Sequence, residues 1–111
     1  MAGAIRIRVR FLPEVEGGRR TLPSDLLSCG TYRPHIVVGE EMRALVNEAG
    51  VSTEDYLGIV FIAQTEPLFA GQEIEAEITK AYPNVDYSLL TQGAMFTVRE
   101  GASIVATGHV L

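Results

Sequence analysis

The chain has 111 residues, of which 47% are hydrophobic and 21% are charged, and this composition excludes an intrinsically disordered chain. The length predicts a single domain over residues 1–111 with one core. The 14 acidic residues outnumber the 9 basic ones and give a net charge of −5, which disfavours general attraction to nucleic acid phosphates.

The first predicted element is a strand from Ala4 to Leu12. Apolar residues there alternate with arginines at positions 6, 8 and 10, which is typical of a strand with one buried face. A second, short strand is expected at His35 to Val38, because Pro34 favours an extended backbone just before it.

The segment from Glu40 to Gly50 breaks the strand pattern. Counted from Met42, its apolar residues recur at i, i+3, i+4 and i+7, and two glutamates stand at its start. This spacing predicts a short inserted α-helix that ends at Gly50. Its apolar stripe would cover one end of the fold or pack against a second copy of the chain.

Four further strands are expected at 56–63, 72–79, 94–99 and 103–110, each bounded by glycine, proline, asparagine or aspartate. Six strands with little helix predict an all-β fold, a small six-stranded antiparallel barrel of the Greek-key kind with the short inserted helix.

Two charged ladders stand on these strands, the arginines at 6, 8 and 10 and the glutamates at 73, 75 and 77. The arginines could follow a phosphate backbone, or they could pair with the glutamates within the barrel or across a dimer interface. Cross-strand pairs of opposite charge contribute roughly 0.2–1 kcal/mol each, so we favour the pairing of the two ladders over RNA binding.

Several short runs occur in an order and spacing that resemble the third domain of the translation elongation factor Tu family. These runs are Glu16-Gly17-Gly18-Arg19, Thr31-Tyr32-Arg33-Pro34, Asp55-Tyr56-Leu57-Gly58-Ile59-Val60, Phe96-Thr97-Val98-Arg99-Glu100-Gly101 and Val105-Ala106-Thr107-Gly108-His109-Val110. Gly17 and Gly18 permit positive φ and a close backbone approach, which suits a tight turn that presents Arg19 and Arg20.

The resemblance implies a free-standing copy of a β-barrel domain with an outward surface that meets transfer RNA or a neighbouring protein domain. The candidate contact residues of this surface are Gly17, Gly18, Arg19, Arg20, Tyr32, Arg33, Arg99, Glu100 and Gly101. We therefore expect a noncatalytic binding module linked to translation, which acts by protein–protein interaction or by self-association as a homodimer. An accessory RNA-binding domain is the alternative.

Catalysis is not expected, although an enzyme or small-ligand binder at the barrel mouth is a third hypothesis. The only lysine, Lys80, lies outside any phosphate-binding loop motif, so a GTPase is excluded. Cys29, His35 and Asp25 could form a nucleophilic set, but a lone cysteine is more often a small buried hydrophobe. His35 and His109 lack the spacing of metal ligands, so neither a metal nor a cofactor is predicted.

The remaining sequence features concern the compartment. The single cysteine forms no internal disulfide, which fits a reducing cytosol. The chain begins without an apolar signal-peptide core, and its longest apolar stretch, at 57–63, is far shorter than the ~20 residues of a membrane-spanning helix. We expect a cytoplasmic protein that does not bind membranes.

Overall fold

The computed structural model describes residues 4–18, 34–39, 48–49, 56–82, 84–100 and 103–111. Its strands are β1 (Ile5–Phe11), β2 (His35–Val38), β3 (Leu57–Gln64), β4 (Glu73–Lys80), β5 (Met95–Glu100) and β6 (Ser103–Val110). All six expected strands are confirmed, each to within about a residue at its ends.

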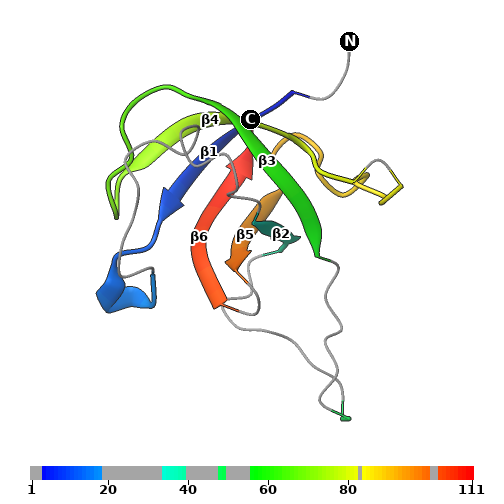
Figure 1. Cartoon of the computed structure of the whole chain (residues 1–111), viewed down its shortest axis with the longest axis horizontal. Coiled ribbons are helices and arrows are strands. Elements are labelled where there is room, and N and C mark those ends of the chain that lie inside the picture. The colour runs from blue at the N-terminus through cyan, green and yellow to red at the C-terminus, as the bar shows by residue number, and fades with distance from the viewer. Residues whose placement is uncertain (1–3, 19–33, 40–47, 50–55, 83, 101–102) are drawn as a thin grey trace.

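The strands close into an antiparallel barrel in the order β1-β4-β3-β2-β5-β6, and β6 returns to pair with β1 (Figure 1). Strands β2, β3 and β4 follow one another as neighbours, and β5 then lies beside β2. This arrangement of four strands is a Greek key, as the sequence predicted. Closure leaves no free strand edge among these strands.

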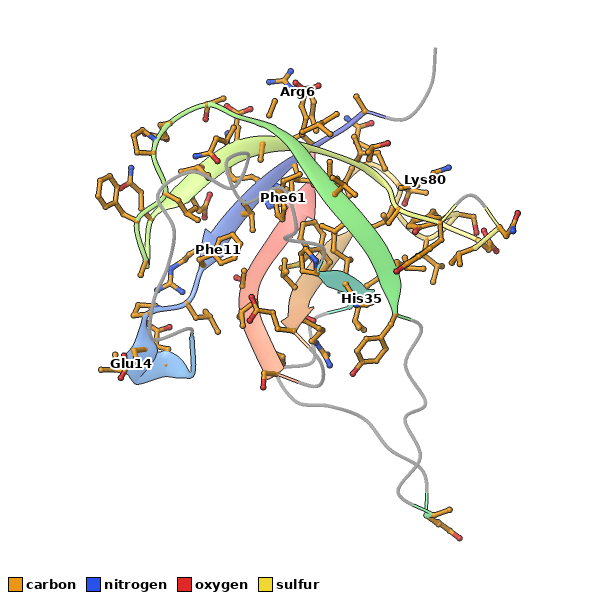
Figure 2. The ribbon with its side chains drawn as sticks, in the orientation of Figure 1. Arg6, Phe11, Glu14, His35, Phe61 and Lys80 are labelled. Atoms are coloured by element: carbon orange, nitrogen blue, oxygen red, sulfur yellow. The ribbon has the colours of Figure 1, made fainter. Side chains whose placement is uncertain are left out.

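The barrel interior is filled by the apolar residues that alternate along the strands. Ile7 and Val9 of β1 are fully buried, as are Ile59 of β3 and Ile78 of β4. The rings of Phe11 and Phe61 meet at a centroid distance of 6.3 Å and a tilt of 47° (Figure 2). Burial of these side chains is the main source of stability of the fold.

The charged alternation on β1 and β4 lies on the outer face. The register sets Arg6 opposite Glu77, Arg8 opposite Glu75 and Arg10 opposite Glu73, so the expected pairing of the two ladders is confirmed within the barrel. The shortest contact joins Arg6 to Glu75 at 3.1 Å, but the Arg6 side chain is 66% exposed. Exposed pairs of this kind contribute about 0–1 kcal/mol each.

The described residues contain no α-helix, and their one helical element is the 3₁₀ turn η1 (Glu14–Glu16). The helix expected over 40–50 lies outside the described residues, except that Glu48 and Ala49 form a turn. The strand pattern is therefore what defines the fold class.

Gly17 and Gly18 end η1 in the tight turn that the sequence predicted. Gly17 has a φ of +96°, and the amide of Gly18 donates to the carbonyl of Pro13 at 3.0 Å. A Cβ on Gly18 would overlap the carbonyl of Leu12. Both positions therefore require glycine, one for its backbone conformation and one for the close approach.

A third glycine, Gly108 of β6, tests the packing of the barrel. Its Cβ would overlap the Arg8 carbonyl oxygen and lie 2.8 Å from the Phe96 ring, so Gly108→Ala should lower the free energy of unfolding by about 2–3 kcal/mol in urea titration. Gly58→Ala is the matched control, because its Cβ would meet mainly the Tyr82 ring, which is 50% exposed and can move. Equal losses of unfolding free energy in Gly108→Ala and Gly58→Ala would contradict the close packing inferred at Gly108.

Candidate functional site

A fully buried arginine lies on the outer face of β5. Phe96 and Val98 point into the core, so the intervening Thr97 and the following Arg99 point outward, yet they are 2% and 0% exposed. The Arg99 Nε donates to the Thr97 hydroxyl at 2.8 Å. Because arginine stays charged in proteins, burial of this guanidinium requires such partners.

Two aromatic side chains complete what we call the arginine cluster, defined as His35, Tyr56, Thr97 and Arg99. Arg99 Nη1 donates to the Tyr56 hydroxyl at 3.4 Å, and its Cζ lies 5.8 Å from the centre of the Tyr56 ring. His35 is opposite Arg99 in the β2–β5 register, and its ring meets the Tyr56 ring edge-on at a centroid distance of 6.0 Å. The cluster thus joins β2 and β5 to the residue that precedes β3.

Four of the nine candidate contact residues lie within the described part of the chain. Gly17 and Gly18 form the turn after η1, whereas Arg99 and Glu100 end β5, and no hydrogen bond or ion pair of the described residues links the two pairs. The other five, Arg19, Arg20, Tyr32, Arg33 and Gly101, lie outside the described residues.

One of the four described candidate contact residues, Arg99, is buried in the structure. The strand register sets it on the outer face, but it is 0% exposed, and its guanidinium donates to the hydroxyls of Thr97 and Tyr56.

Of the three residues considered for catalysis, the structure describes only His35. Cys29 and Asp25 lie outside the described ranges, and His35 belongs to the arginine cluster. Within the ranges that are described, no group of three His, Cys, Asp or Glu side chains is placed to hold a metal ion. The same ranges contain no helix with the length and apolarity needed to cross a membrane.

The connection between β4 and β5 is anchored by Tyr87. This side chain is 5% exposed, and its hydroxyl donates to the Gly58 carbonyl at 2.5 Å and accepts from the Tyr82 amide at 3.3 Å. Lys80 Nζ lies 5.6 Å from the centre of the same ring. These contacts fix the loop against β3.

Around this anchor the loop exposes apolar side chains that the sequence analysis did not identify. Tyr82, Val85 and Leu89 are 50%, 39% and 56% exposed, and we call them the loop surface. A cavity of about 350 Å³ beside it is lined by Tyr56, Leu57, Val85, Asp86 and Leu89. The signal in the sequence is apolar residues within a turn-forming segment, where polar residues are usual.

The chain was compared with known proteins, and no protein-family model and no curated protein matches it.

The hydrogen bond inside the arginine cluster gives a sharp test of its role in stability. Thr97→Val keeps the shape of the side chain but leaves the buried Arg99 Nε without this acceptor, so it should cost about 1–3 kcal/mol of unfolding free energy. Thr107→Val is the control, because Thr107 pairs with Thr97 in the β5–β6 register and its hydroxyl makes no hydrogen bond within the described ranges. Similar urea midpoints for both variants would show that the bond is dispensable.

Asp86, which lines the cavity beside the loop surface, should titrate below its ordinary range. Hydrogen bonds from the backbone amide and the side chain of Ser88 lower the pKa of the Asp86 carboxyl. The hydrogen bond from the Ser88 amide to Asp86 Oδ1 is 2.9 Å long. Because the folded pKa lies below the unfolded value, the contribution of Asp86 to stability is present above that value and is lost as the pH falls through the folded pKa. NMR titration of the carboxyl carbon should show the low midpoint, and Ser88→Ala should move it part of the way back. A midpoint at the ordinary value would refute the assignment.

Proposed function

We propose that this chain is a noncatalytic module that binds another protein through the loop surface. The observation that carries this proposal is the exposure of three large apolar side chains, Tyr82, Val85 and Leu89, on a loop that Tyr87 holds in place. Apolar and aromatic side chains on a loop whose backbone is held in place bury area on binding at little cost in ordering the loop, which makes them suitable anchors for a partner.

We further propose that the module is related to the third domain of elongation factor Tu and is linked to translation. The closed six-strand barrel agrees with this relationship, and so does the glycine turn at Gly17 and Gly18. A short helix over 40–50 belongs to the same proposal.

Protein binding is favoured over RNA binding by the charges of the described strands. Arg6, Arg8 and Arg10 each face a glutamate on β4, so a phosphate backbone along β1 would meet carboxylates beside every cation. RNA contact therefore depends on Arg19, Arg20 and Arg33, which a salt-dependent titration with transfer RNA would test. Tight binding that weakens steeply with salt would favour the RNA alternative.

A photo-crosslinking experiment tests the loop surface. A photoreactive amino acid in place of Leu89 should give a discrete protein adduct in host cells, and Leu89→Glu should reduce recovery of that partner by about tenfold or more. Phe69 is the matched control position, because it is 58% exposed where Leu89 is 56% exposed but lies in the β3–β4 connection. Equal crosslinking or equal sensitivity at both positions would overturn the proposal.

Sedimentation of the purified protein shows whether the partner is a second copy of the chain or a different protein. A dimer that Leu89→Glu converts to a monomer, while Phe69→Glu does not, would identify the partner as a second copy of the chain. A monomer that still gives the adduct would identify a different protein.

A further inference from the structure

The outer face of the barrel carries a second surface, formed where β5, β6 and β1 lie side by side (Figure 1). A cavity of about 310 Å³ opens there, and we call it the outer groove. The side chains that give it its chemistry are Arg8, Arg10, Glu73, Met95, Thr107 and His109.

The strand registers order these side chains into two rows. Met95, His109 and Arg8 lie opposite one another across β5, β6 and β1, and Thr97, Thr107 and Arg10 form the next row. Each row therefore runs from a neutral side chain on β5 to an arginine on β1. Gly39, which follows β2 with a φ of +132°, keeps one side of the groove free of a side chain.

In the first row, the side chains of Arg8 and His109 are hydrogen-bond donors that no other described residue accepts from. Arg8 donates no hydrogen bond within the described ranges, and its contacts with Glu73 and Glu75 are long, at 3.8 and 3.9 Å. His109 likewise makes no side-chain hydrogen bond to the part of the chain that is described. Arg10, in contrast, is held by Glu16 at 3.1 Å and by the Gly71 carbonyl at 3.1 Å.

We infer that the outer groove binds an acidic segment of a polypeptide, with one carboxylate on Arg8 and His109 and a neighbouring apolar side chain on Met95. An arginine fork takes a carboxylate through two parallel hydrogen bonds, which are stronger than the long contacts that Arg8 makes to its glutamates. Met95 is 50% exposed beside His109 and offers a flexible apolar contact. This site is separate from the loop surface and does not depend on it.

The surroundings of the groove favour a short acidic peptide over a nucleic acid. Both rows end at the arginines of β1, because the next strand, β4, sets Glu73 opposite Arg10 and Glu75 opposite Arg8. On its β6 and β5 sides the groove is lined by Thr107, His109 and Met95 and by no carboxylate. A single carboxylate bound there meets Glu73 on one side only, whereas an extended phosphate backbone along the rows would pass over both glutamates. The net charge of −5 repels acidic peptides in general, so their binding requires a local site.

Fluorescence anisotropy of the full chain with a labelled peptide of alternating glutamate and leucine tests the inference at low ionic strength. Arg8→Gln and His109→Gln should each weaken binding, Arg8→Gln by about tenfold or more. Arg6→Gln is the matched control, because it removes the same charge from the same strand but outside the groove, and it should change the affinity less than about twofold. In the unsubstituted protein, NMR shifts on peptide binding should map to Met95, Thr107 and His109.

Several results would overturn the inference. These are absence of peptide binding, equal loss in Arg6→Gln and Arg8→Gln, equal binding of a peptide with glutamine in place of glutamate, or preference for a single-stranded oligonucleotide. Leu89→Glu should bind the peptide normally, so failure at the outer groove is distinguishable from failure at the loop surface. The NMR map keeps the test decisive if a variant does not fold.

Discussion

Pairing between β1 and β6 joins the first and last strands of the chain, and the closed barrel depends on it. Five residue pairs form this contact, from Ile7 with Val110 to Phe11 with Ala106. It is a contact between residues about 100 positions apart, so its loop-closure cost is met only when most of the core is also formed. Once closed, the barrel has no edge at these strands, and its surfaces lie on its outer face and in its loops.

Closure also explains why the inner and outer faces have such different chemistry. Alternation sends Ile7 and Val9 inward and Arg8 outward, and the neighbouring strands continue each row. The narrow interior requires Gly108 next to Phe96. The buried Arg99 is the exception, because it faces outward and yet is fully covered together with Thr97.

Much of this fold could be predicted from the sequence, because strand periodicity is a local property. The six strands, the ladder pairing and the glycine turn each depend on residues a few positions apart or on complementary charge. The burial of Arg99 could not be predicted, since alternation gives the direction of a side chain but not what covers it. The outer groove also could not, because it requires the register of Met95, His109 and Arg8 across three strands.

The difference between the whole chain and one local site also applies to charge. A net charge of −5 argues against a general polyanion partner, but it says nothing about a site the size of one carboxylate. Strand β4 holds three glutamates, and Arg8 lies between that strand and the neutral side chains of β6 and β5. An anion is therefore attracted only on the β6 side of Arg8. A barrel that sets a basic strand between an acidic strand and a strand without charged partners can in this way select short acidic segments and reject long polyanions, without any change in its core.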